Sequence, residues 1–264
     1  MPRNNLMTRI TNTAVISVAI LCMIHLARGE DVSIENELQS FSVRTGATRV
    51  IYSAGSPGAS MTVINPQAYP MLVQSEVMME DRKTRAPFIV TPPLFRLDGH
   101  QQSRIKVIAT SSHNNETKES LYWLCVTGIP PEADADWTGD AYKKKKAGQH
   151  ATLLTQLRIK SCLKLLVRPS SLRGHPEDFA SGLTWAKRGK TLTVSNPTPF
   201  FITLRSVQLG KSSVANPEYV PPMGKRELSI PADASGQVHW RLITDYGGDS
   251  KEFTSDMSTD PVSH

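Results

Sequence analysis

Two cysteines, Cys125 and Cys162, are the residues whose chemistry can be stated from type and spacing alone. If the chain is exported to an oxidising compartment, these two thiols are expected to pair as one disulfide. Closing the loop between Cys125 and Cys162 would stabilise the folded chain by about 4 kcal/mol in the chain-entropy estimate, less any strain. The alternative is a pair of buried thiols, which a reducing compartment would favour.

Motifs for catalysis or metal binding are absent from the sequence. It contains no G-x-S-x-G elbow, no H-E-x-x-H pair, no phosphate-binding G-x-x-x-x-G-K-[ST] loop and no Cys/His group with zinc spacing. We therefore expect no enzyme activity, no cofactor and no metal. A triad assembled from distant residues stays open as an alternative, because sequence order does not constrain such triads.

The N-terminal 29 residues predict export. Arg3 and Arg9 precede an apolar run over 14–24, and Ala27-Arg28-Gly29 then places small residues at the two positions that determine cleavage after Gly29. The run is shorter than the roughly 20 residues that span a bilayer, so we expect a signal peptide over 1–29 and no stable membrane insertion. Cys22 follows the bulky Leu21, which argues against a lipoprotein.

Removing this segment takes away three arginines and no acid, so the formal net charge falls from +6 to +3. That is mild for a nucleic-acid binder, and we expect no nucleic-acid partner.

Period-two apolar patterns separated by Gly, Pro, Asn and Ser predict a mainly β chain. A linker with two prolines and a glycine, 168–176, divides it into an N-terminal domain over 30–168 and a C-terminal domain over 169–250, with a flexible tail over 251–264. The spacing is typical of sandwiches. The predicted strands are 48–52, 60–65, 71–79, 88–91, 102–109, 119–129 and 151–167 in the first domain, and 183–185, 191–195, 201–208, 226–230 and 237–244 in the second.

The segment between Ile129 and Ala151 is too long and polar for an ordinary hairpin loop, which indicates a functional or mobile segment. Its four lysines, 143–146, are read as solvated, with phosphate contact as the alternative. Alternation after this loop places Leu153, Leu157 and Ile159 on one strand face. Periodicity alone does not separate a core face from an exposed one.

Several runs resemble the periplasmic chaperones of the chaperone–usher pathway, the PapD-like superfamily, and they follow that family's order along most of the chain. The runs are 48–52 (Thr-Arg-Val-Ile-Tyr), Asn65-Pro66 with 69–75, 88–97, 119–124 with Ile129-Pro130-Pro131, 162–169, 195–201 and 244–248. The cysteine pair, the long loop and the extended N-terminal segment 32–38 resemble the family's long-loop branch, which has a disulfide and usually builds thin fibres or capsule-like polymers.

The resemblance implies an all-β fold of two immunoglobulin-like β-sandwiches in an L-shaped arrangement, with a cleft between them. It also implies a periplasmic chaperone that caps fimbrial or capsular subunits lacking their last strand, and delivers them to an outer-membrane usher. The chaperone would lend each subunit a strand by β-augmentation. The implied donor strand carries Ala151, Leu153, Thr155, Leu157 and Ile159. Thr155 departs from the family, where a large apolar residue is common, which puts that contact in doubt.

Other site residues come from the same resemblance. Arg49 and Lys164 match two cations that bind the subunit's terminal carboxylate. Glu119, Arg168 and Asp245 match an ionic cluster between the domains. An auxiliary strand would contribute the apolar side chains Val32, Ile34 and Leu38.

Two other readings stay open. A secreted β-sandwich adhesin or fibre subunit is the main alternative, since a fold does not establish a role; a subunit would carry its own N-terminal donor strand. A secreted hydrolase is the third reading. The sequence also leaves open whether the free chaperone caps its own strand by forming an oligomer.

Overall fold

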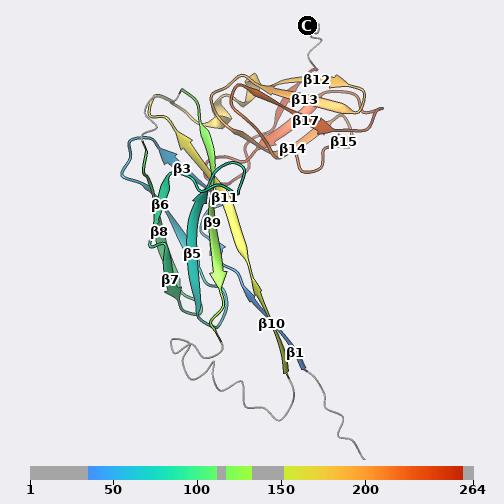
Figure 1. Ribbon diagram of the computed structural model, residues 1–264. Coiled ribbons are helices and arrows are strands. Elements are labelled where there is room, and N and C mark those ends of the chain that lie inside the picture. The colour runs from blue at the N-terminus through green and yellow to red at the C-terminus, as the bar shows by residue number, and fades with distance from the viewer. Residues whose placement is uncertain (1–34, 112–116, 133–151, 258–264) are drawn as a thin grey trace, which may run out of the picture. The chain divides into compact units, whose positions relative to one another are not determined.

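A computed structural model of the chain describes residues 35–111, 117–132 and 152–257 (Figure 1). The regular structure described is almost all β-strand, with two short 3-10 helices, η2 (Pro176–Asp178) and η3 (Ala180–Gly182). One apolar core is built from residues before the linker and a second from residues after it. The expected all-β fold with two sandwich domains is confirmed. The expected signal peptide, Val32, Ile34, Ala151 and nearly all of the long loop lie outside the described residues.

Two sheets enclose the core of the first domain. One has the order β3-β11-β9-β5-β7, and the other has the order β2-β4-β8-β6. Strand β11 runs parallel to β3 and antiparallel to β9. The strands are β2 (Arg44–Thr45), β3 (Arg49–Ser53), β4 (Ala59–Ile64), β5 (Met71–Met78), β6 (Phe88–Thr91), β7 (Leu94–Leu97), β8 (Gln102–Ala109), β9 (Ser120–Ile129) and β11 (Lys160–Arg168).

Alternation decides which side chains enter this core. In β5, Met71, Val73 and Val77 are buried in this core, whereas Leu72, Gln74 and Glu76 are partly exposed, as expected for a strand with one apolar face. Strand β9 differs, because all of residues 121–128 are buried. A strand buried on both faces reads as a continuous apolar run, so the outer face of this sheet must also be covered.

Of the described residues, 35–38 and 152–155 belong to a small unit that is separate from the remainder. These residues are the beginnings of β1 (Glu35–Phe41) and β10 (Thr152–Arg158), two strands that pair with each other. The remaining residues of both strands belong to the larger unit. The two strands form a two-stranded sheet of their own (Figure 1).

The single strand predicted over 151–167 is wrong in one respect, because it is divided at Ile159 into β10 and β11. The Ile159 amide donates to the Phe41 carbonyl (3.2 Å), and the Ile159 carbonyl accepts from the Gly128 amide (3.2 Å). The chain therefore changes its partner from β1 to β9 at this residue. Gly128 permits the crossing, since a Cβ there would collide with the Phe41 carbonyl.

The second domain has a three-stranded sheet, β12-β13-β17, and a larger sheet of order β15-β14-β18-β19, with β16 also paired to β14. Trp185 and Trp240 meet in its core with ring centroids 5.2 Å apart. The strands are β12 (Thr184–Arg188), β13 (Thr191–Asn196), β14 (Ile202–Leu209), β15 (Ser212–Ser213), β16 (Tyr219–Val220), β17 (Gly224–Ser229), β18 (Val238–Leu242) and β19 (Phe253–Ser255).

The flexible tail expected over 251–264 is wrong for its first residues. Strand β19 pairs with β18, Phe253 is buried in the second core, and Met257 packs against that core. Phe253 anchors this segment in the core, but most of its neighbours are polar. The segment therefore has too few apolar residues to form a recognisable pattern. Strand β7 was also missed. Residues 258–264 lie outside the described range.

Each domain contains an Asn-Pro turn whose asparagine side chain donates hydrogen bonds to backbone carbonyls. The Asn65 side-chain amide donates to the carbonyls of Tyr69, Leu97 and Asp98. The Asn196 amide donates to three carbonyls of its own domain, those of Phe200, Val220 and Pro221. Both asparagines are fully buried. Each amide group thus donates to backbone carbonyls from separate segments of its domain.

Candidate functional site

Strand β10 carries exposed apolar side chains. In the small unit Leu153 is 60% exposed, and in the larger unit Leu157 and Ile159 are 45% and 36% exposed. These residues alternate along the chain, and Thr155 between them is exposed. Leu154 occupies an intervening position, on the other face of the strand, and is also 42% exposed. In the described chain β10 pairs with β1 and with no other strand.

Strand β1 carries one of the apolar residues expected for the auxiliary strand. Leu38 is 65% exposed, whereas Val32 and Ile34 are outside the described residues. Exposed leucines are common singly, but apolar side chains at alternate positions of one strand indicate a strand that accepts a partner.

Arg49 and Lys164 are register partners on the parallel strands β3 and β11. Register partners project from the same face of a sheet, so the structure brings the two expected cations together. Arg49 is 7% exposed, and its Nη1 donates to the Ile243 carbonyl of the second domain (3.0 Å). Its Nε is buried and has no hydrogen-bond partner.

Burial dominates the electrostatics of this pair. It lowers the pKa of Lys164 to about 8, and the positive charge of Arg49 acts in the same direction. Burial also lowers the pKa of Arg49, against the attraction of Asp245 and Glu119. Within the described ranges, neither cation makes a salt bridge to a carboxylate. Two desolvated positive charges therefore share one row of the sheet.

The same row continues into an apolar cluster. Lys164 is the register partner of Trp123 in β9, which is the partner of Met78 in β5. This outer cluster, which also covers the second face of β9, is completed by Phe201 of the second domain and edged by Tyr219. Its buried members are Met78, Leu121, Trp123, Cys125, Leu166 and Phe201.

Glu119, Arg168 and Asp245 also meet, as the resemblance implies. The Arg168 guanidinium donates from Nε to Glu119 Oε1 (2.7 Å), and from Nη1 and Nη2 to the two Asp245 oxygens (2.8 and 2.9 Å). The second oxygen of Glu119 accepts from the Phe201 amide (2.8 Å). His175 is a fourth member, with Nδ1 2.9 Å from Asp245 Oδ2. We call these four residues the ionic cluster.

The pKa shifts in this cluster follow from burial and pairing. Burial raises the pKa of Glu119 even though Arg168 opposes it. Burial would also raise the pKa of Asp245, but hydrogen bonds from Arg168 and His175 outweigh it and lower that pKa. The hydrogen bond with Asp245 raises the pKa of His175.

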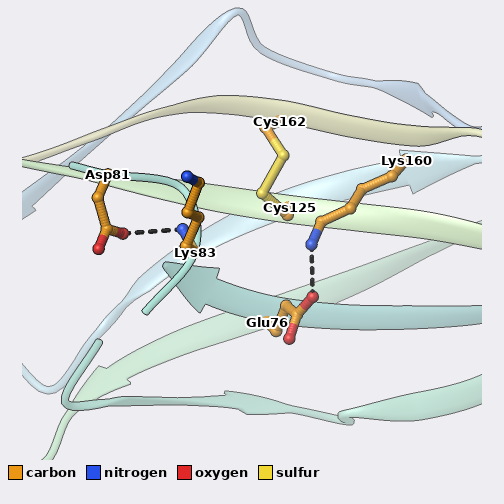
Figure 2. Close-up of a disulfide and its surroundings, with 6 residues drawn as sticks. All are labelled: Glu76, Asp81, Lys83, Cys125, Lys160 and Cys162. Atoms are coloured by element: carbon orange, nitrogen blue, oxygen red, sulfur yellow. Dashed lines mark hydrogen bonds and ion pairs between the residues drawn. A yellow bond between two sulfur atoms is a disulfide. The ribbon is translucent and has the colours of Figure 1, made fainter. Parts of the chain in front are cut away.

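The expected disulfide is present between Cys125 and Cys162, with an S–S distance of 2.04 Å. The two cysteines are register partners on β9 and β11. Figure 2 shows the bond beside the ion pair of Lys160 Nζ and Glu76 Oε1, 2.7 Å apart. The disulfide thus joins the two strands that carry Trp123 and Lys164.

Sequence reasoning missed three residues near these groups: His175, Arg82 and Tyr219. His175 lies in the linker, where a lone histidine gives no signal of its partner 70 positions away. The Arg82 guanidinium lies 3.7 Å from the centroid of the Trp123 ring, and the Lys164 Nζ lies 5.4 Å from that of Tyr219. These contacts join residues far apart in sequence and leave no local pattern.

Comparison with known proteins agrees with this architecture. Residues 42–173 match the family model of the pili and flagellar-assembly chaperone PapD N-terminal domain, and residues 178–254 match the pili assembly chaperone PapD C-terminal domain. The chaperone protein AggD of Escherichia coli is 39% identical over 250 residues, 95% of this chain and 98% of that protein. MyfB of Yersinia enterocolitica is 40% identical, covering 90% and 92%.

Two similar solved structures are also of chaperones. The E. coli chaperone DraB is 45% identical with a TM-score of 0.74, covering 85% of this chain and all of that one. The SafB chaperone, in complex with the SafA pilin of Salmonella enterica, is 42% identical with a TM-score of 0.74, covering 84% and 100%. The chain belongs to the PapD family of pilus-assembly chaperones. The resemblance and the disulfide expected for the long-loop branch are thereby confirmed.

Two further observations bear on the site. No helix within residues 35–111, 117–132 and 152–257 is long and apolar enough to cross a membrane. Over the same ranges, no group of three or more His, Cys, Asp or Glu side chains is arranged to hold a metal ion.

Proposed function

We propose that this protein is a periplasmic chaperone that holds fimbrial or capsule-like subunits by lending them strand β10. A subunit that lacks its last strand exposes an apolar groove and unpaired backbone groups, which promote aggregation. Strand β10 would supply hydrogen bonds along its edge. Leu153, Leu157 and Ile159 would fill the groove. Burial of each such side chain is worth about 1.5–3 kcal/mol before ordering costs.

The observation that carries this proposal is the state of β10 itself. It pairs only with β1 in the described chain, and its alternate apolar side chains are exposed. A strand in the core of a finished sandwich would have these side chains covered. The auxiliary strand, with Leu38, extends the apolar surface beside it.

Register requires a fixed point, because a slip of one residue turns every side chain to the other face. Arg49 and Lys164 supply it in our proposal by binding the terminal carboxylate of the subunit through charge-assisted hydrogen bonds. Their shared row, their burial and their lack of a carboxylate partner within the described residues support this role. The ionic cluster keeps the two domains in one orientation. Delivery to an outer-membrane usher completes the cycle, and family membership supports it.

Co-expression with the SafA pilin in the E. coli periplasm tests the proposal. We expect the chain to protect SafA and to co-purify with it. Leu157→Glu should abolish recovery of the complex, because it places a charge on the donor face. Leu154→Glu is the matched control: its leucine is about equally exposed but occupies an alternate position of the same strand. Loss of SafA with both variants, or with neither, would contradict the assigned donor face.

Lys164→Ala tests the anchor in the same assay, with the exposed Lys211→Ala as control. We expect SafA to be degraded only with the first variant. Undiminished SafA with Lys164→Ala would contradict carboxylate anchoring, and no SafA complex with the unaltered chain would overturn the proposed function.

A further inference from the structure

Lys164 lies near two aromatic rings from different domains. Its Nζ is 5.9 Å from the ring centroid of Trp123 and 5.4 Å from that of Tyr219. Trp123 is its neighbour across the sheet in β9, whereas Tyr219 belongs to β16 of the second domain. Both distances are within the range of cation–π attraction.

Tyr219 is held in place from several sides. Its hydroxyl donates to Glu80 Oε1 of the first domain (2.9 Å), and its ring packs edge-on against Phe201, with centroids 5.6 Å apart. The Arg226 guanidinium lies 4.7 Å from its centroid, and Arg226 is itself paired with Glu218 (2.7 Å). The ring is thus fixed by contacts that do not involve Lys164.

Trp123 is fixed in a comparable way. Its side chain is buried, and the Arg82 guanidinium lies 3.7 Å from its ring centroid. Arg82 belongs to a tight loop in which the Asp81 carboxylate accepts from the Lys83 and Thr84 amides and the Thr84 hydroxyl. Arg82 has a left-handed backbone conformation (φ 57°) in that loop. The loop thereby presents Arg82 to the ring.

The chemistry of these neighbours matters. A buried ammonium needs a counter-charge, and a carboxylate of this chain would supply one but would also occupy its N–H donors. Aromatic faces attract the cation through their quadrupole and leave those donors available. In the described part of the chain no salt bridge involves Lys164, and Glu218, whose negative charge raises the Lys164 pKa, is engaged with Arg226.

We propose that Trp123 and Tyr219 are positioning residues of the carboxylate anchor, which hold the Lys164 ammonium charged and oriented while leaving its hydrogen-bond donors for the subunit terminus. This inference rests on the proposed function and adds the residues that set the affinity of the anchor. It also makes anchoring depend on both domains, since Tyr219 comes from the second and is tied to Glu80 of the first. The pKa of about 8 agrees with an ammonium that remains largely charged at neutral pH.

The first test uses the SafA complex. We measure how fast fluorescently labelled wild-type chaperone replaces the unlabelled variant. Tyr219→Leu keeps an apolar side chain but removes the π face, and replacement should become roughly five- to thirtyfold faster. Tyr219→Phe restores the ring and should recover most of the stability of the complex. Tyr246→Leu, at an 88% exposed tyrosine, is the matched control and should behave as wild type.

The second test follows Lys164 directly in the free chain by NMR titration of its side-chain nitrogen. The pKa should fall below about 8 in Tyr219→Leu and return in Tyr219→Phe. An unchanged titration together with unchanged replacement in Tyr219→Leu would overturn the inference while leaving the proposed function intact. Failure of wild-type protein to bind SafA would instead overturn the proposed function, and the titration would still decide whether the rings hold Lys164 charged.

Discussion

Two groups of charged residues lie where the domains touch, and they are built on opposite plans. In the ionic cluster, Arg168 donates to both Glu119 and Asp245, and His175 contacts Asp245 as well. In the cation row, Arg49 and Lys164 are adjacent, and in the described residues no carboxylate pairs with either. Glu119, Arg168 and Asp245 of the first group and Arg49 of the second are all mostly covered, so solvent access alone does not account for the difference.

The difference separates architecture from recognition. A charge that is matched within the chain orients the parts that supply it but has little left to offer a ligand. A buried cation without a partner costs folding free energy, and that cost is recovered only when an anion arrives. In the proposed function, the ionic cluster accordingly holds the joint between the domains and the cation row binds the client.

The largest effect is expected in the ionic cluster. Asp245→Asn leaves Arg168 with one carboxylate and should lower the free energy of unfolding by about 3 kcal/mol, because breaking one partner of a buried pair leaves an uncompensated charge. Urea unfolding measures the loss. Asp249→Asn, at a partly exposed aspartate paired with Arg205, is the control. If the Asp245→Asn and Asp249→Asn variants were equally stable, the ionic cluster would not have the structural role that sets it apart from the cation row.

The cation row should respond in the opposite direction. Lys164→Met removes a desolvated charge and should raise the free energy of unfolding of the free protein by about 1–2 kcal/mol at pH 7. The lowered pKa corresponds to about 3 kcal/mol, which solvent screening reduces. Lys211→Met should change nothing. A destabilised Lys164→Met would show that Lys164 has a structural partner.

The sign of the pH dependence sharpens this point. With its pKa lowered in the folded state, Lys164 makes the folded chain bind fewer protons than the unfolded chain between about pH 8 and the usual lysine range. The wild type should therefore gain stability relative to Lys164→Met as the pH rises through this window. Subunit binding should weaken over the same window, because it needs the charged form.

The smallest effect concerns His175, whose side chain is about half exposed. Its pKa is raised in the folded protein, so its contribution is present below the unfolded pKa and is lost as pH rises through the folded pKa. His175→Gln should cost less than about 1 kcal/mol at pH 5.5 and nothing at pH 8.5, because solvent screens this pair. In the Asp245→Asn background the substitution should have no effect at either pH.

Much of the fold could be predicted from alternation and turn residues. The inner face of β5, with Met71, Val73 and Val77, is an example, and so is the pairing of Cys125 with Cys162 from composition and export. The division at Ile159 could not be predicted, because the apolar alternation continues through it. The strand ends there because the backbone of Ile159 changes its hydrogen-bond partner from Phe41 in β1 to Gly128 in β9.

The site was only partly predictable. Arg49 and Lys164 came from resemblance, since a lone arginine and a lone lysine 115 residues apart carry no pattern of their own. Tyr219 and His175 were missed, because their contacts with Glu80 and Asp245 depend on tertiary packing alone.

The outer cluster around Trp123 has a consequence for how the molecule is made. Leu121, Trp123 and Leu166 belong to the first domain, but Phe201 is contributed by the second. Chains emerge N-terminus first, so Leu121, Trp123 and Leu166 become available for folding before Phe201 does. Until the second domain has folded, this apolar surface lacks Phe201, and an uncovered apolar surface of that kind promotes aggregation.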